Sequence, residues 1–466
     1  MAVSGSSSPS SPKRRRLLAE EAPPPPSQEG TTDKLMSLPN EILDIILARV
    51  PFERLVRFGC LSRAWRRRWE SVPELRVELP PRLSSARALW RCAAPVRSFR
   101  GRFSHLLGTT TSRWLRALAR KRVQELTLQF ENIPWLLLPK RDVVLGPAFF
   151  SCDSLVHLHL QNCRMPPSQS GFPGFPKLAS LTLVDVALLF KGGGVQLQHL
   201  IAAAPDLVVL KLEDVVAQAS ADRFAVEEFV IRAPKLRNLS LTFFSLCEDN
   251  GCRIAQELPL LEEASISIDC LVGSFGPQDF LDIFRPIAAV NTLWFDAKAT
   301  SCTVNPLEGI TWRFENLRKA SLRVTFCRLP SFMAIVSLLR CAPHIEDLDI
   351  ETCDTKRSTN EVEIDEDFLN SEIQDDLISG LKCVSLSGAK YLSNQMCFMK
   401  FILSKAGSLQ SFVVTFDYPE RSRRYKKACK ELAECQIASP QVIVRQNFTD
   451  DKIQQQMCQQ RMMTLK

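Results

Sequence analysis

Few side chains in this sequence have the types and spacing that chemistry requires. His157 and His159 are two residues apart, so on a β-strand both imidazoles would lie on one face, as half of a metal site. No third ligand is in view, and we interpret them as two exposed surface histidines. The glycine-rich stretch from Lys191 to Gly194 lacks the Lys-Ser/Thr pair of a phosphate-binding loop, so we interpret it as an ordinary loop.

Nucleophile and metal signatures are also missing from the sequence. It contains no G-x-S-x-G or H-E-x-x-H motif, and no cysteine is paired with a histidine in a familiar pattern. Its 16 cysteines are scattered without a C-x-x-C pair, which favours reduced, buried thiols over disulfides or zinc ligands. We therefore expect no catalytic residue, no metal and no cofactor.

Length and composition predict a soluble protein. With 466 residues and 45% hydrophobic residues, the chain can hold two or three domains with sizeable cores. It begins without the apolar segment of a signal peptide, and no apolar run could cross a bilayer, so we expect an intracellular protein with no membrane partner. A basic cluster of the nuclear-import kind, which leads us to expect the nucleus and/or the cytoplasm, consists of Lys13, Arg14, Arg15 and Arg16.

The net charge of +8 is unevenly distributed. Residues 53–122 contain 18 Lys/Arg and 4 acidic residues, whereas residues 344–380 contain 13 acidic residues and 2 basic ones. A basic half could bind nucleic acid. Its arginines, however, alternate with apolar residues rather than clustering with glycines and aromatics, which favours a solvated face. Nucleic acid is therefore the less favoured partner.

An apolar stretch at residues 35–69 predicts three short helices. Ser37 can cap the first helix, Pro39 fits its first turn, and Pro51 ends it. The apolar residues then recur at helical spacing. Three such helices cannot enclose a core by themselves, so one face must meet another surface.

From residue 123 onward, an L-x-x-L-x-L hexamer recurs eleven times. The copies start at residues 123, 155, 178, 207, 236, 261, 290, 317, 345, 381 and 409, a mean period of about 29. This pattern predicts a leucine-rich-repeat solenoid, in which each repeat supplies one strand and returns along the outside. We predict returning helices at residues 220–233 and 329–342. Cys163 and Cys353 occupy the ninth position, where an Asn or Cys normally closes the turn.

The predicted fold class is α/β: three N-terminal helices followed by an irregular leucine-rich-repeat solenoid with parallel strands and a helical or irregular outer face. The expected parts are a Ser/Pro-rich disordered tail (1–32), the helical domain (33–75), a basic linker or solenoid cap (76–122), the repeats (123–380), a C-terminal repeat module (381–446) and a polar tail (447–466).

The helical domain resembles an F-box. It has the Leu38-Pro39 start, an E-I-L-x-x-I-L-x-x-V-P pattern over residues 41–51, C-L-S-R-A-W at 60–65 and a closing Trp69. The order of parts resembles the plant F-box/leucine-rich-repeat proteins with a C-terminal FBD-type region. Residues 381–416 and the segment R-R-Y-K-K-A-C-K-E-L-A after them carry that second resemblance.

The resemblance implies a non-catalytic substrate receptor of an SCF-type cullin–RING ubiquitin ligase. The F-box would bind a Skp-family adaptor and through it a cullin, and the repeats would bind an unknown protein substrate. The adaptor contacts that it implies are Leu38, Pro39, Ile42, Leu43, Ile46, Val50, Pro51, Leu55, Val56, Leu61 and Trp65.

The residues beside the inward leucines would line the concave face, where solenoids usually bind. Among them, Asp347, Asp349 and Glu351 form a negative patch that would attract a basic substrate segment, with Trp294 as an apolar anchor. Alternatively, this acidic region is only a solvated surface. The alternative function is a repeat scaffold or nucleic-acid-associated protein outside any ligase, whose binding would fall steeply with salt.

Overall fold

The computed structural model describes residues 37–58, 74–77, 89–90, 95–103, 108–131, 143–217, 227–245, 252–254, 258–270, 277–297, 305–354, 363–417 and 423–448. The predicted contacts Leu61 and Trp65 and the basic cluster at residues 13–16 lie outside these ranges. The chain divides into two compact units, residues 1–47 and 48–466.

Prolines set the start of the first two helices. Helix α1 (Asn40–Ala48) begins directly after Pro39, whose carbonyl accepts the N–H groups of Ile42 and Leu43, both at 3.1 Å. Helix α2 (Phe52–Phe58) begins in the same way after Pro51. Because proline has no N–H to leave unsatisfied and its φ is already helical, it is well suited to a helix start.

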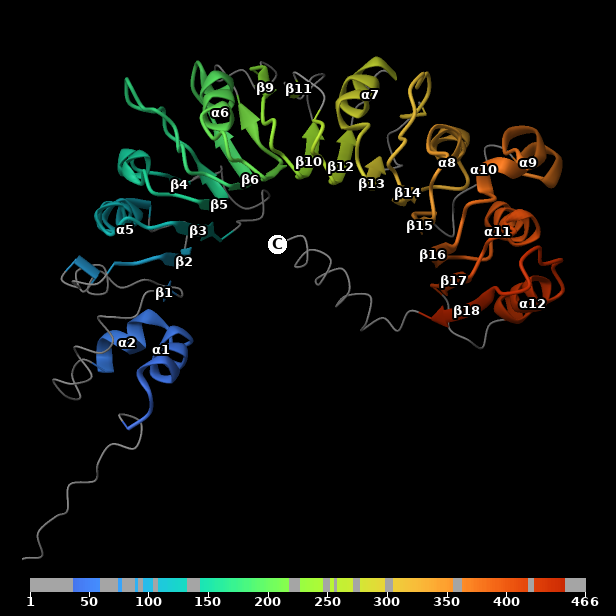
Figure 1. The fold of residues 1–466 in the computed structure, drawn as a ribbon, viewed down its shortest axis with the longest axis horizontal. Helices are drawn as coiled ribbons and strands as arrows, with labels where there is room; N and C mark the ends of the chain where they lie inside the picture. The colour runs from blue at the N-terminus through green and yellow to red at the C-terminus, as the bar shows by residue number, and fades with distance from the viewer. Residues whose placement is uncertain are drawn as a thin grey trace, which may run out of the picture. The chain divides into compact units, whose positions relative to one another are not determined.

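The unit at residues 48–466 is built on one parallel sheet whose strands follow chain order (Figure 1). Its main path runs through β1 (Glu74–Val77), β2 (Ser98–Phe103), β3 (Glu125–Phe130), β5 (His157–Arg164), β6 (Ser180–Leu188), β7 (Val209–Glu213), β10 (Asn238–Ser245), β12 (Glu263–Cys270), β13 (Thr292–Ala297), β14 (Lys319–Val324), β15 (Asp347–Thr352), β16 (Cys383–Ala389), β17 (Ser411–Phe416) and β18 (Ile443–Phe448). Two short strands pair beside this path, β4 (Val143–Val144) with β5 and β8 (Val216–Ala217) with β6.

All eleven hexamers fall on strands of this sheet, and each strand begins at the third residue of its hexamer. The strand alternation explains this agreement, since every second side chain turns inward. Leu181, Leu210 and Leu239 are adjacent in the register and almost completely buried. The predicted α/β solenoid with parallel strands is confirmed.

Helices cover the outer side of the curved sheet, while the strands line its inner, concave side (Figure 1). These helices are α5 (Gly108–Arg120), α6 (Gly193–Ala202), α7 (Pro277–Phe284), α8 (Leu329–Cys341), α9 (Glu366–Glu372), α10 (Asp375–Ile378), α11 (Ser393–Lys405) and α12 (Arg423–Ala433). The hydrophobic core lies between the sheet and these helices. Among the described residues, no helix combines the length and apolar character needed to cross a bilayer.

One of the two predicted returning helices is confirmed and the other is not. The helix predicted at 329–342 is α8. In the other segment, residues 229–231 form strand β9 (Phe229–Ile231), which pairs with β11 (Cys252–Ile254) in a small parallel sheet. The Phe-Val-Ile run is buried on alternate residues, as in a strand, and its aromatic and β-branched side chains favour that state.

The sheet is longer than the hexamers indicate. Strands β1 and β2 and helix α5 lie within residues 74–120, in the segment predicted as a linker or cap. At the other end, β18 extends to residue 448, into the predicted polar tail. These terminal strands lack the full hexamer, so the pattern does not reveal them.

Candidate adaptor-binding helix and substrate-facing strands

Helix α1 exposes three isoleucines on one face. Ile42, Ile45 and Ile46 are 45%, 53% and 40% exposed, whereas Leu43 and Leu47 are each 2% exposed. Positions three and four apart lie on one side of a helix, so the isoleucines form a continuous stripe. A solvent-exposed apolar stripe on a helix whose other apolar side chains are buried is characteristic of a surface that binds another protein.

The structure places the predicted adaptor contacts in three groups. Pro39, Ile42 and Ile46 are exposed, and Leu38, Val50, Pro51 and Val56 are half-buried. Leu43 and Leu55 are buried, so they differ from the prediction and contribute to packing instead. Sequence reasoning missed Ile45, although its spacing from Ile42 was a usable signal.

On the concave side, the register brings the predicted substrate-facing residues onto neighbouring strands. Trp294 of β13 lies beside Ser321 of β14, which lies beside Asp349 of β15. Trp294 is half-buried and flanked by the core residues Leu293 and Phe295, so its predicted outward register is correct. The Ser321 hydroxyl donates to the Asp349 carboxylate at 3.1 Å.

A charged ladder crosses the same three strands. Arg323 of β14 pairs with Asp296 of β13 at 3.3 Å and with Glu351 of β15 at 3.1 Å. Burial opposes the charge of this guanidinium, but nearby Cys353, Glu351 and Asp296 outweigh that effect and raise the pKa of Arg323 above its ordinary value. The arginine therefore stays cationic and neutralises part of the expected negative patch.

One of the two remaining carboxylates of the patch also has a cationic neighbour. Asp347 lies next to Lys319 in the register between β14 and β15, and Asp347, Asp349 and Glu351 are all half-buried. The patch is thus a mixed surface on which Asp347 and Asp349 supply the negative charge. Such a surface offers a basic chain both carboxylates and an aromatic side chain.

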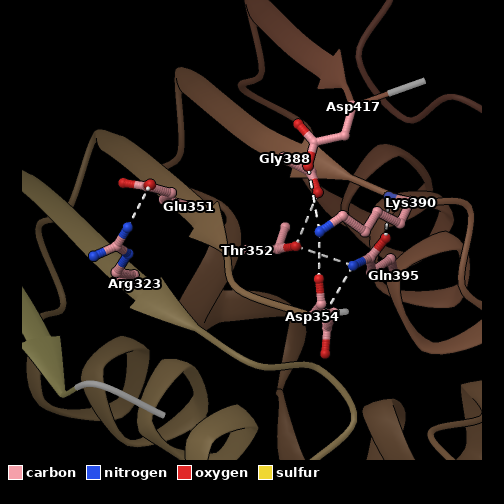
Figure 2. A network of polar contacts seen from close by, with 8 residues as sticks. All are labelled: Arg323, Glu351, Thr352, Asp354, Gly388, Lys390, Gln395 and Asp417. Carbon is pink, nitrogen blue, oxygen red and sulfur yellow. Dashed lines mark hydrogen bonds and ion pairs between the residues drawn. The ribbon is translucent and has the colours of Figure 1, made fainter. Parts of the chain in front are cut away.

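A buried polar network holds the loops behind these strands (Figure 2). The Asp354 carboxylate is fully buried and accepts the backbone N–H groups of Phe326 and Cys327, both at 3.1 Å. Gln395 of α11 donates to Asp354 at 2.8 Å and to the Thr352 hydroxyl at 3.1 Å. Buried polar groups that are satisfied in this way fix one arrangement of the chain.

The network continues into the last repeats. The Thr352 hydroxyl donates to the Gly388 carbonyl at 3.1 Å, and Lys390 reaches both the Asp354 carbonyl and the Asp417 carboxylate (Figure 2). Gly388 has φ +75°, and a Cβ there would meet the Thr352 carbonyl at 2.9 Å, so glycine is required. These contacts therefore link strands β14 to β17 on the side of the sheet opposite the polar side chains of its concave surface.

The ninth-position cysteines behave differently from each other. Cys163 is buried in β5, as a turn-closing residue should be. Cys353 is half-buried; its backbone N–H bonds to the Val324 carbonyl of the preceding repeat, and its thiol interacts with Arg323. The neighbouring Asp354 supplies the side chain that closes this turn. Burial raises the pKa of the Cys353 thiol to about 11 despite the opposing charge of Arg323.

The glycine-rich stretch is closed by the protein's own carboxylate. Helix α6 begins at Gly193, and Glu227 accepts the N–H groups of Gly192 at 2.8 Å and Gly194 at 2.9 Å. A helix start with free N–H groups is an anion site, and here Glu227 fills it. The prediction of a plain loop is therefore wrong from Gly193 onward, although the stretch is not a phosphate-binding loop either.

The described residues contain no group of three or more His, Cys, Asp or Glu side chains placed to hold a metal ion. His157 is exposed and His159 is half-buried, on the polar side of β5. Their shared face follows from the strand geometry, as predicted.

Comparison with known proteins agrees with this geometry. Residues 35–76 match the model of the F-box domain, and residues 111–276 match a model described as the leucine-rich repeats of FBD-associated F-box protein At5g56370. The chain therefore resembles F-box proteins with leucine-rich repeats. The exposed isoleucines of α1 lie within the F-box, and β3 to β12 lie within the matched repeats.

Similar proteins from Arabidopsis thaliana are named FBD-associated F-box proteins. The chain is 22% identical to FBD-associated F-box protein At5g38590 over 86% of its own length and 98% of that relative. It is 23% identical to FBD-associated F-box protein At5g60610 over 81% and 98%, and 27% identical to FBD-associated F-box protein At5g56370 over 52% and 56%. F-box proteins of this type are in general non-catalytic subunits that bind a Skp-family adaptor.

Proposed function

We propose that this protein is a substrate-recognition subunit of an SCF-type cullin–RING ubiquitin ligase. Its F-box binds a Skp-family adaptor, and through it a cullin, while its repeats bind the protein to be ubiquitinated. The observation that carries the proposal is the exposed stripe of Ile42, Ile45 and Ile46 inside the matched F-box.

The physical basis of adaptor binding is burial of this stripe. Removing apolar surface from water contributes about 25 cal/mol per Å². Three adjacent isoleucines can therefore form the centre of an interface, where a few side chains dominate the binding energy. Exposed Pro39 extends the same surface at the start of the helix.

The experiment is co-purification of the full-length chain with a Skp-family adaptor and a cullin. The wild type should recover both partners. The double substitutions Ile42→Asn/Ile46→Asn and Leu38→Ala/Pro39→Ala should each reduce adaptor recovery at least tenfold, which corresponds to about 1.4 kcal/mol. Undiminished recovery by correctly folded double variants would contradict the assignment.

For the substrate, the proposal places a basic segment across β13 to β15. Asp347 and Asp349 supply the negative charge and Trp294 the apolar contact, while Glu351 is held in its pair with Arg323. The pair Asp347→Asn/Asp349→Asn should reduce substrate capture at low salt and leave adaptor recovery unchanged. Proximity labelling with the proteasome blocked would identify the captured proteins. Equal capture by wild type and variant at low salt would exclude this docking site.

The proposal also includes nuclear entry through the cluster from Lys13 to Arg16. Replacing these four residues with alanine should shift a fluorescent fusion of the full-length protein from the nucleus to the cytoplasm. An unchanged distribution would remove the import signal from the proposal while leaving the ligase function intact.

A further inference from the structure

A basic cavity lies at the C-terminal end of α5, on strands of the sheet other than the candidate substrate-facing ones. Its volume is about 790 Å³, and its wall includes Trp90, Arg97, Arg120, Lys121 and Arg122. Among the described residues of this wall, none is acidic. This volume lies within the range of ligand-binding pockets.

The backbone holds these cations in place. The carbonyl of Arg97, just before β2, accepts the N–H groups of Gln124 and Glu125 at 3.0 Å each, which joins the starts of β2 and β3. Helix α5 ends through bonds from Lys121 and Arg122 to its last turn, and Arg122 takes a left-handed φ of +55°. The helix end thus places three consecutive basic residues beside Arg97.

Arg120 is positioned by an aromatic ring. Its guanidinium carbon lies 4.0 Å from the centre of the Trp90 ring, and Trp90 is 39% exposed. A guanidinium stacked on a ring uses its face, so the N–H donors at its edge remain available to an anion. Arginine donors match phosphate oxygens in pairs, which makes phosphate a better fit than a single-point anion.

The arginines of this cavity differ from others in the repeats. Within the described part of the chain, Arg97, Arg120 and Arg122 form no ion pair, whereas Arg340 pairs with Glu372 and Lys382 with Glu346 at 2.7 Å each. Grouped cations without a carboxylate repel one another, and an anionic ligand would relieve that repulsion.

Toward the later repeats, the positive charge does not continue at the corresponding positions. Lys121 and Arg122 lie in the turn just before β3. At the corresponding place in the register, the turns before β5, β6 and β7 carry Asp153, Lys177 and Asp206, respectively. A long polyanion would therefore find no continuous basic track along this edge. A compact phosphate group fits the observed charge better.

We propose that this cavity binds the phosphate of a phosphorylated serine or threonine in a partner protein. The Arg97, Arg120 and Arg122 guanidinium groups receive the phosphate, and Trp90 covers an adjoining apolar part of the peptide. This binding does not require the adaptor, and it stands separately from the ligase function proposed above.

The test is fluorescence polarisation at low salt with the full-length protein. The probes are a degenerate pool of labelled peptides with a fixed central phosphoserine or phosphothreonine, and the same pool without phosphate. The phosphorylated pool should bind at least about tenfold more tightly. Arg120→Gln/Arg122→Gln should abolish that preference, and Trp90→Leu, which keeps every charge, should weaken binding severalfold.

The matched control is Arg113→Gln/Arg116→Gln, which removes two exposed arginines of the same helix that do not line the cavity. It should keep the preference within about twofold, and thermal unfolding should show that every variant folds. Equal affinity for the two pools, or an equal loss in the control, would overturn the proposal. The proposal would also be overturned if inorganic phosphate alone displaced the pool at the concentration at which the phosphopeptides bind. Tighter binding of a single-stranded oligonucleotide that the peptides do not displace would overturn it as well.

Discussion

Gln395 donates its side-chain amide to the Asp354 carboxylate at 2.8 Å, across 41 residues of sequence. The carboxylate is fully buried, and each of its two oxygens also accepts a backbone N–H. One side chain of α11 therefore depends on a loop in the preceding repeat. These contacts hold the candidate substrate-facing strands from the opposite side of the sheet.

The first prediction concerns this carboxylate. Asp354→Asn keeps the shape but turns one oxygen into an NH₂ group that faces a backbone donor. We expect a loss of about 2–4 kcal/mol in the free energy of unfolding, measured with urea. Asp367→Asn, at an exposed site on α9, should change it by less than about 0.5 kcal/mol. A loss no larger than that of the control would show that the network does not stabilise these repeats.

The second prediction concerns Ile45, the exposed residue that the sequence pattern did not single out. Ile45→Asn should weaken adaptor binding by about 1–3 kcal/mol, because the side chain is at the centre of the exposed stripe. Arg49→Asn introduces the same asparagine side chain at an exposed position beyond the helix and should change adaptor binding little. Calorimetric titration with purified adaptor measures both. If the two variants bind alike, the stripe is not the adaptor surface.

The third prediction tests the glycines at the start of α6. A Cβ on Gly194 would meet the Glu228 carbonyl at 2.5 Å, whereas a Cβ on Gly407 has no atom within 4 Å. Gly194→Ala should cost about 1–3 kcal/mol through overpacking, and Gly407→Ala should be close to neutral. Urea unfolding of the two variants gives the comparison. Equal stability would mean that the helix start can shift freely.

The fourth prediction is a loss of stability in alkali. Burial raises the pKa of the Cys152 and Cys341 thiols to about 12, from 9.0 for an exposed thiol. Above pH 9 the unfolded chain loses these protons while the folded chain keeps them, so ionisation favours unfolding and stability falls as pH rises.

At pH 10.5 each of these thiols should cost on the order of 1–2 kcal/mol relative to pH 8. Denaturant unfolding of the wild type and of Cys152→Ala/Cys341→Ala at both pH values measures the difference. The double variant should be less stable at pH 8 but show a shallower decline. Parallel declines would contradict the assignment of the pH effect to these two thiols.

The strands of the solenoid were predictable because their signal is local. The residues that make Leu210 part of a strand lie in the same hexamer as Leu210 itself. Because side chains alternate along a strand, burial of every second residue of the hexamer follows from that pattern. The segment ending in β9 was not predictable in this way. Val226, Phe229 and Val230 satisfy a helical spacing as well as a strand, and only the pairing with β11 decides.

The candidate sites were partly predictable for a related reason. Helical spacing identifies the apolar residues of α1, but it does not say whether the leucine stripe or the isoleucine stripe is buried, which is why Leu43 was included and Ile45 omitted. The partners of Asp354 and Arg323 are set by sheet register and by a helix in a later repeat. No pattern within one repeat contains that information.

The order of strands in the sheet equals their order in the chain, and this affects how the protein can be synthesised. A strand that leaves the ribosome finds its pairing partner already made, so growth can proceed repeat by repeat from the N-terminal side. Asp354 is an exception. In a nascent chain, its carboxylate lacks the hydrogen bond from Gln395 until that residue has been translated. Ribosome-bound chains that stop before α11 should therefore carry an unfinished last segment, which is where a chaperone would be needed most.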